Sequence, residues 1–131
     1  MLDASAVLRY TDDEPGGTRV RKLLGTALDT GDDLIISVVN WGEAIGVIMK
    51  KYAAEGRRIA AELMALPFTF VDADRKQAEA AAILRQDCQI PYADAFAAVL
   101  AERLSATLVT GDFDFKNLPA GFVRVEYLPQ K

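Results

Sequence analysis

Hydrophobic residues along the chain recur either at helical spacing or in short uninterrupted runs, and polar turns separate these segments. A spacing of three and four residues is typical of one face of a helix, whereas short apolar runs are typical of buried strands. The first pattern predicts helices at residues 18–28, 37–54, 57–66, 74–88 and 91–104. The second predicts strands at residues 34–36, 68–71 and 107–110, and an alternating edge strand at residues 122–128. The residues before Asp3 suit the tail of a strand, which a short helical turn or two follows.

Strands that are each separated by one or two helices imply parallel pairing, with the helices covering both faces of the sheet. We therefore expect an α/β fold with a central, mostly parallel sheet of four to five short strands. The 131 residues are one domain's worth of chain, able to bury roughly two-thirds of the unfolded surface. A single domain over residues 1–131 is expected.

Composition excludes several kinds of chemistry. The chain contains no histidine, so imidazole catalysis and histidine-ligated zinc are impossible. The single Cys88 cannot form an internal disulfide or a site of several cysteines. The net charge of -4 argues against a protein that coats nucleic acid through phosphate contacts. No apolar run approaches the ~20 residues that span a bilayer, and no signal pattern opens the sequence, so a cytoplasmic protein is expected.

Asp94 and Asp112 occupy positions at which acidic side chains often bind ligands or take part in catalysis. Pro91 suits the first position of a helix, so Asp94 falls in the first turn, where the helix dipole is expected to keep the carboxylate ionised. The alanines at positions 97, 98 and 101 share its face and are expected to leave room beside it. Asp112 lies just beyond a strand, at the sheet edge where ligands gather. Taken singly, Asp94 is also typical of an acid that only interacts favourably with the helix dipole. Asp112 is also typical of a turn residue or a helix cap.

Two further acids occupy similar positions. Asp3 lies at a strand-to-helix junction, where it suits an N-cap as well as a functional group. Glu43 lies two turns into a largely apolar helix, where a solvated acid is less expected. Near them, Ser5 is typical of a helix cap or of a residue whose hydroxyl orients a carboxylate. Asn40 suits either a polar group that supports the site or a hydrogen bonder of the first helical turn.

Other charged residues gather outside these positions. The acids of the loop at residues 12–14 are expected to be solvated. Four basic residues flank the turn after the second long helix and suit a solvated tip or, alternatively, a contact with RNA phosphates or with an acidic partner segment. They are Lys50, Lys51, Arg57 and Arg58.

Four short sequences, taken together, resemble those of a known family. They are Leu2-Asp3-Ala4-Ser5-Ala6, Asn40-Trp41-Gly42-Glu43, Tyr92-Ala93-Asp94-Ala95-Phe96 and Leu108-Val109-Thr110-Gly111-Asp112-Phe113-Asp114-Phe115. In this order and spacing the chain resembles PIN-domain ribonucleases, specifically the VapC-like toxins of bacterial and archaeal toxin–antitoxin pairs. The resemblance spans essentially the whole chain, and the last two sequences are its more specific parts. The family usually has a few more apolar residues before its first Asp, so the first strand is expected to be short.

The resemblance implies a PIN-like three-layer sandwich and a metal-dependent endoribonuclease that leaves a 5′-phosphate and a 3′-hydroxyl. It implies that the catalytic residues and the ligands of Mg²⁺ or Mn²⁺ are Asp3, Glu43, Asp94 and Asp112, with Asp114 a lesser candidate ligand. Ser5, Asn40 and Thr110 would support this site, although Thr110 suits a plain strand residue nearly as well. Partners are implied too: a VapB-like antitoxin, whose tail would cross the helix hairpin at residues 37–66 and reach the acids with a basic side chain, and a second copy of the chain in a homodimer.

Elementary electrostatics agrees with a metal site. Two carboxylates ~6 Å apart repel by about 3 kcal/mol at an effective dielectric near 20, so four clustered acids need a cation or must partly protonate. Ligands that offer only oxygen select a hard ion such as Mg²⁺ or Mn²⁺.

Other classes of protein fit less well. A haloacid-dehalogenase-like phosphatase needs a second Asp two residues after the first, where this chain has Ser5. A receiver-type signalling domain needs an adjacent acidic pair, whereas Asp3 is followed by Ala4. A calcium loop that starts at Asp112 would need Gly at its sixth position and Glu at its twelfth, which are Asn117 and Val123. The open alternative is a PIN-like module that binds RNA or a partner protein without cutting.

Overall fold

The computed structural model describes residues 1–130, which form α-helices, two short 3₁₀ helices and four strands. The helices are α1 (Ala4–Thr11), α2 (Gly17–Thr30), α3 (Val38–Tyr52), α4 (Gly56–Met64), α5 (Arg75–Cys88) and α6 (Tyr92–Arg103). The 3₁₀ helices are η1 (Ala53–Glu55) and η2 (Phe113–Asn117). The strands are β1 (Leu34–Ser37), β2 (Phe68–Val71), β3 (Leu108–Thr110) and β4 (Val125–Tyr127).

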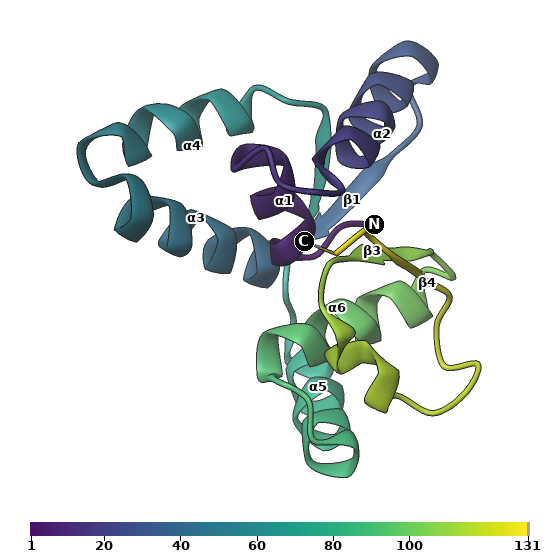
Figure 1. Cartoon of the computed structure of the whole chain (residues 1–131). Coiled ribbons are helices and arrows are strands. Elements are labelled where there is room, and N and C mark those ends of the chain that lie inside the picture. Colours follow the sequence, from purple (N-terminus) through teal and green to yellow (C-terminus); the bar gives the residue numbers. More distant parts are fainter. Residues whose placement is uncertain (131) are drawn as a thin grey trace.

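All strand pairs of the sheet are parallel. β1 pairs with β2, and β3 pairs with β4. Leu2 joins the two pairs through parallel bridges to Ile36 of β1 and Val109 of β3. The Leu2 N–H donates to the Ile35 carbonyl at 2.8 Å, and the Val109 N–H donates to the Met1 carbonyl at 2.8 Å. The order across the sheet is therefore β2, β1, Leu2, β3, β4, so the N-terminus lies in its middle (Figure 1).

Helices cover both faces of this sheet (Figure 1). On one face, Leu34 and Ile36 of β1 are packed among buried residues of α1, α2, α3 and α4. On the other face, Ile35 and Leu108 pack with α5 and α6. Neighbouring residues of β1 thus point to opposite faces, as the period of two in a strand requires. The predicted α/β architecture, a parallel sheet between two helical layers, is confirmed.

Local capping explains where several helices begin. Side-chain oxygens of Asp3, Ser37 and Asp74 accept hydrogen bonds from main-chain N–H groups two or three residues later. Such caps satisfy donors that have no partner within the helix. The predicted helix starts near residues 37 and 74 are therefore confirmed. Pro91 is the N-cap of α6 and not its first residue, one position from its predicted place.

The two terminal elements compare differently with the prediction. α1 has 8 residues, which is about two turns as expected, and its apolar side packs into the core. The last strand covers Val125–Tyr127 and not residues 122–128. It pairs with β3, which is itself 3 residues long, and one main-chain hydrogen bond continues the pairing at each end: the Leu108 N–H donates to the Arg124 carbonyl at 2.9 Å, and the Leu128 N–H donates to the Thr110 carbonyl at 2.8 Å.

The helix α6 is enclosed on all sides. Every residue from Asp94 to Ala101 is buried, because α6 contacts α3, α5, β1 and β3 together. The alanines at positions 97, 98 and 101 are each 0% exposed. The expectation that they leave open space beside Asp94 was wrong, since their small side chains let the neighbouring elements pack closely. Within residues 1–130, neither α6 nor any other helix is long and apolar enough to cross a membrane.

Candidate metal centre

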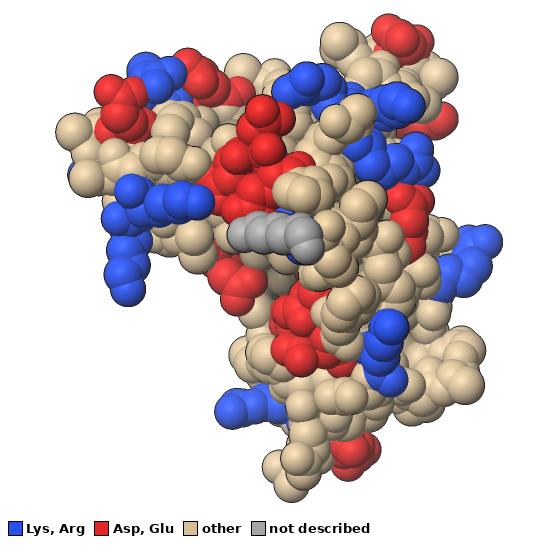
Figure 2. All heavy atoms as spheres, in the orientation of Figure 1, with Lys and Arg blue, Asp and Glu red and all other residues tan. Residues whose placement is uncertain are grey.

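Acidic side chains gather at the carboxyl-terminal edge of the sheet and on helices that begin there. Asp3 follows Leu2, the central residue of the sheet, and Asp112 and Asp114 follow β3. Glu43 lies on α3, which follows β1, and Asp94 lies in the first turn of α6. Figure 2 shows an indentation between the part of the molecule that carries α3 and α4 and the part that carries α5 and α6, with Asp and Glu side chains along it.

Asp3 is buried, yet both of its carboxylate oxygens have hydrogen-bond donors. The Ser5 hydroxyl donates to Oδ1 at 2.7 Å and the Thr110 hydroxyl donates to Oδ2 at 2.5 Å. The same two hydroxyls accept hydrogen bonds, each 2.9 Å long, from the main-chain N–H groups of Gly111 and Asp112. This network joins the start of α1 to the loop after β3, so it fixes Asp3 relative to Asp112.

Asp94, Asp112 and Asp114 form the tightest acidic group. Each offers one carboxylate oxygen, and the three oxygens all lie within 4.8 Å of one another. Asp94 is buried, and its Oδ2 has no hydrogen-bond partner among residues 1–130. Leaving a buried acceptor unpaired costs about 1–3 kcal/mol, and more when it is charged. A cation at this oxygen would remove the cost, whereas a proton would remove the charge but leave an O–H group in need of an acceptor.

Burial and mutual repulsion raise the pKa of the clustered acids. Burial is the largest cause at Asp94, whose pKa rises to about 8, and the charges of Asp112, Asp3 and Glu43 add to it. Burial also raises the pKa of Asp3, although the hydrogen bonds described above act in the opposite direction. Glu43 is an exposed residue, although its apolar helix favoured a less solvated acid. Partial burial of its carboxyl is still the largest cause that raises its pKa, and the charges of Asp3 and Asp112 add to it. Without a cation, Asp94 keeps its proton at neutral pH, because burial outweighs the helix dipole that the sequence reasoning relied on.

The donor set of this centre fits a hard divalent cation. Every side chain in it offers oxygen, which is the ligand that Mg²⁺ and Mn²⁺ prefer. A positive charge would relieve both the unpaired Asp94 oxygen and the repulsion that raises these pKa values. Asp94, Asp112 and Asp114 are close enough to share one ion. Asp3 and Glu43 lie near enough to shift the pKa of Asp94, but they offer no atom to that three-residue group.

Asn40 ties α3 to the start of α6. Its side chain is fully buried, and its Nδ2 donates to the carbonyl of Ala93 at 3.0 Å. Ala93 precedes Asp94, so this bond holds the first turn of α6 against the helix that carries Glu43. The Asn40 Oδ1 has no hydrogen-bond partner among residues 1–130.

The expectation that the acids of the loop after α1 are solvated holds for the exposed Asp13 but was wrong for Asp12 and Glu14. Asp12 accepts a hydrogen bond from the Lys51 ammonium at 2.8 Å and another from the Tyr52 hydroxyl. Glu14 forms an ion pair with Arg9 at 3.6 Å. The loop folds back on the chain, so its acids neutralise Arg9 of α1 and Lys51 of α3.

The basic turn between α3 and α4 is partly neutralised as well. Arg58 donates to Glu62 at 2.7 Å and to Glu55. Lys50 and Arg57 are exposed and form no ion pair within residues 1–130. Half of the predicted basic contact surface is therefore already engaged within the chain.

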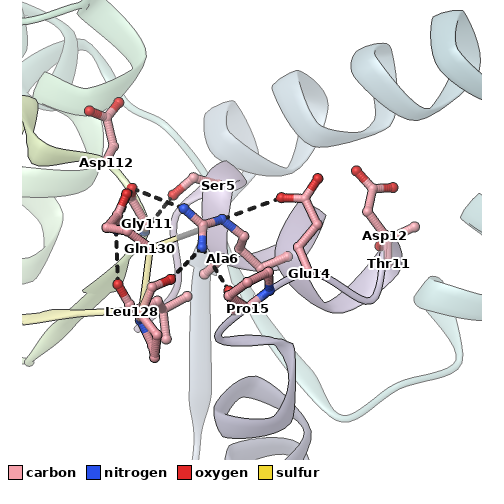
Figure 3. A network of polar contacts seen from close by, with 12 residues as sticks. Ser5, Ala6, Thr11, Asp12, Glu14, Pro15, Gly111, Asp112, Leu128 and Gln130 are labelled. Carbon is pink, nitrogen blue, oxygen red and sulfur yellow. Dashed lines mark hydrogen bonds and ion pairs between the residues drawn. The ribbon is translucent and has the colours of Figure 1, made fainter.

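Arg9 is a buried cation beside the site that the sequence reasoning did not single out. It donates to the carbonyls of Pro15 and Pro129, each at 2.7 Å, and to the carbonyl of Gly111 at 3.4 Å (Figure 3). A Cβ atom on Gly111 would lie 2.9 Å from this guanidinium, so the two groups are in close contact. Arg9 thus holds the loop that leads to Asp112. Its signal in the sequence is weak, because it is one arginine in a short amphipathic helix.

Comparisons with known proteins bear on this arrangement. The model of the PIN domain family matches residues 1–121. No curated protein matches the chain. VapBC2 from Rickettsia felis, in a structure bound to a DNA fragment from their promoter, is similar with a TM-score of 0.77 and 20% identity over 98% of each chain. DNA-bound VapBC from Salmonella typhimurium has a TM-score of 0.72 and 19% identity over 97% of this chain and 96% of that one. A toxin–antitoxin complex from Klebsiella pneumoniae has a TM-score of 0.65 and 24% identity over 95% and 93%. At these identities the likeness concerns the fold.

Proposed function

Because this chain belongs to the PIN domain family, we propose that it is a metal-dependent endoribonuclease and the toxin of a toxin–antitoxin pair. It hydrolyses phosphodiester bonds of RNA and leaves a 5′-phosphate and a 3′-hydroxyl. The residues that carry this activity are Asp3, Glu43, Asp94 and Asp112, and Asp114 is a further ligand of Mg²⁺ or Mn²⁺.

The observation that carries the proposal is the buried Asp94 carboxyl. One of its oxygens lacks a hydrogen-bond partner, and its pKa rises to about 8 among neighbouring acids. An asparagine would occupy nearly the same space without this repulsion. Acids held so close together at a cost in stability are typical of sites where a cation binds, and strongly perturbed carboxyls are typical of functional sites.

The acidic side chains have different roles in the proposed reaction. Asp94, Asp112 and Asp114 would hold the cation. When bound, it would supply positive charge against the charge that builds up on the phosphate and would lower the pKa of an attacking water. Asp94 must first release the proton from its carboxyl, so metal binding strengthens as the pH rises towards 8. Asp3 is kept in one orientation by two hydroxyls, and Glu43, which is exposed, extends the acidic surface towards solvent.

Cleavage of total RNA tests this function. The wild-type chain should make discrete cuts with Mg²⁺ or Mn²⁺ and none with EDTA, and the mapped ends should carry 5′-phosphates. Asp94→Asn should lower the cleavage rate about a hundredfold or more. The matched control is Asp29→Asn, the same change at an exposed position of α2, which should cut like the wild type. Equal cutting by the wild type and by a folded Asp94→Asn chain would contradict the proposal and leave the non-cutting binding module.

We further propose a VapB-like antitoxin that covers α3 and α4 and directs a basic side chain to the acids, and a homodimer of this chain. Val47 on α3 and Met64 on α4 are 41% and 63% exposed, which offers an apolar contact surface. The acids provide the complementary charge. The structures that share this fold include VapBC and another toxin–antitoxin complex. Such a pair would act on RNA in the cytoplasm.

Co-expression with the product of the neighbouring reading frame tests the partner. The two chains should purify together, and the complex should not cut RNA. Val47→Asp should weaken the complex, whereas Leu28→Asp, a change at a 73% exposed position of α2, should not. Equal weakening by both variants would argue against the surface of α3 and α4. Sedimentation equilibrium of the free chain should give about twice the monomer mass.

A further inference from the structure

A cavity opens beside the acidic group, where α5 ends and α6 begins. Its volume is about 600 Å³, and its wall includes Arg85, Gln86, Gln89, Tyr92 and Asp114. Pockets that bind small ligands have volumes of about 300–1,000 Å³. Asp114 belongs both to this wall and to the acidic group, so a molecule in the cavity would lie directly beside the proposed metal ligands.

Three polar side chains of this cavity are not engaged elsewhere among the described residues. Arg85, Gln86 and Gln89 are exposed, and their side chains form no hydrogen bond or ion pair within residues 1–130. Arg19, by contrast, binds Glu126 through two hydrogen bonds. The guanidinium and the two amides are therefore available as donors and acceptors for a ligand.

The C-terminal end of α5 places Gln89 at the wall of the cavity. Gln89 ends α5 with φ at 55° and ψ at 49°, a left-handed conformation. That conformation costs a non-glycine residue roughly 1–2 kcal/mol, and glycine is the usual residue where helices end this way. The chain instead carries an amide here, at the wall of the cavity.

Tyr92 provides a fixed aromatic wall. Its ring packs edge to face on Phe96, with 5.1 Å between the ring centroids, and its hydroxyl donates to the carbonyl of Ala78 at 3.2 Å. The residue is still 38% exposed. An immobile, partly exposed ring beside amides is the combination that proteins use for the unstacked bases of single-stranded RNA.

We propose that this cavity binds one nucleotide of single-stranded RNA, next to the phosphate on which the acids act. Arg85 pairs with a phosphate of the strand, the amides of Gln86 and Gln89 bond the edge of the base, and Tyr92 lines the base plane. The inference rests on the proposed function, and it adds the place at which the protein holds the RNA strand. Such a contact is needed because the acids themselves repel phosphate, in a chain whose net charge is -4. A base must leave its stack to enter, so a duplex would not fit.

Binding of short RNA, measured without cleavage, tests the proposal. The Asp94→Asn chain with Mg²⁺ is titrated into fluorescein-labelled hexamers of A, C or U, and the anisotropy is followed. Arg85→Ala, added to that chain, should weaken binding about tenfold, as expected for the loss of one charge-assisted contact. The matched control is Arg75→Ala, the same loss of charge at an 82% exposed position at the other end of α5, which should change affinity less than about twofold. Arg85→Lys should recover part of the affinity, and a duplex of the same sequence should bind more weakly than the single strand.

Cut-site mapping in the active chain provides the second measurement. Gln86→Ala and Gln89→Ala should broaden the choice of nucleotide at one fixed position relative to the cut, while the cuts stay metal-dependent. If the wild type cuts RNA but Arg85→Ala and Arg75→Ala bind alike, the cavity proposal is wrong and the nuclease proposal stands. If the wild type does not cut but affinity still depends on Arg85, the cavity proposal stands and the hydrolytic function is wrong. Absence of binding by any hexamer, or equal binding of duplex and single strand, overturns the cavity proposal.

Discussion

Two buried aspartates of the same centre differ in how their oxygens are satisfied. Asp3 is 2% exposed, and hydroxyl donors occupy both of its oxygens. Asp94 is 6% exposed, and its Oδ2 has no hydrogen-bond partner among residues 1–130. Hydrogen bonds to a carboxylate favour its charged form, whereas burial without donors favours the protonated form. Asp94 is therefore the residue at which proton and metal ion compete.

The stability of the metal-free protein should fall as the pH rises, because of Asp94. Its folded pKa of about 8 exceeds its ordinary value of 3.8, so between these values the folded chain holds a proton that the unfolded chain has released. The stabilisation is fully present below about pH 4 and is lost as the pH rises through 8. Melting in EDTA should show a midpoint about 5 °C or more lower at pH 9 than at pH 6. Asp94→Asn should flatten this dependence, and an equally steep dependence in the variant would exclude Asp94 as its source.

Thr110→Val should destabilise the protein by about 1–3 kcal/mol, because it leaves the Asp3 Oδ2 and the Asp112 N–H without partners at a fully buried position. Urea denaturation measures the change. Thr69→Val is the matched control, since the Thr69 hydroxyl donates to Asp33 at the surface, and its cost should stay within about 0.5 kcal/mol. Equal costs would show that the hydroxyl of Thr110 contributes only as an ordinary strand residue.

At the level of elements, the acids are positioned by contacts between segments that are distant in sequence. Asn40 on α3 bonds the carbonyl of Ala93 at the start of α6. Arg9 on α1 packs on Gly111 and bonds the C-terminal tail at Pro129 (Figure 3). Each contact fixes one acidic segment against an element that carries another. The geometry of the centre therefore depends on how the helices pack around the sheet.

Gly111→Ala should lower stability by about 1–3 kcal/mol, because the new Cβ would lie 2.9 Å from the Arg9 guanidinium and must displace it. It should also reduce the rise in melting temperature that Mg²⁺ produces, since the loop leading to Asp112 shifts. Gly25→Ala is the control: a Cβ there meets nothing within 4 Å, and alanine in the middle of α2 should stabilise by about 0.5–1 kcal/mol. Thermal melting with and without Mg²⁺ measures both. A stable Gly111→Ala chain with an unchanged response to Mg²⁺ would contradict this role of Arg9.

For the whole molecule, the parallel sheet decides which charges meet. Leu2 bridges β1 and β3, so the strands end at one edge and their following residues converge there. The chain carries a net charge of -4 and contains a cluster of mutually repelling acids. Apolar packing on both faces of the sheet offsets this repulsion. A bound divalent cation should therefore raise the thermal stability of the whole protein.

Mg²⁺ should raise the melting temperature at pH 8 by about 5 °C or more, since an ion at a hundred times its dissociation constant adds about 2.7 kcal/mol to stability. NaCl at the same ionic strength should produce a much smaller shift. The combined change Asp94→Asn and Asp112→Asn should remove the effect of Mg²⁺. Scanning fluorimetry with added MgCl₂, NaCl or EDTA measures these shifts. An equal rise in NaCl, or in the double variant, would argue against a specific metal site.

The sequence by itself determined the local elements and the kinds of side chain at the sheet edge. The helix positions, the helix starts near residues 37 and 74 and the parallel pairing of the strands follow from apolar spacing and from the order of elements along the chain. Only the tertiary structure decided that Asp94, Asp112 and Asp114 form the tightest group and that Asp94 is buried enough to hold its proton. It also decided that Lys51 is paired with Asp12 and that a cavity lies between Arg85 and Asp114. These properties depend on distances between segments that are remote in sequence and on how much solvent the packed chain excludes, and neither quantity can be obtained from residue spacing.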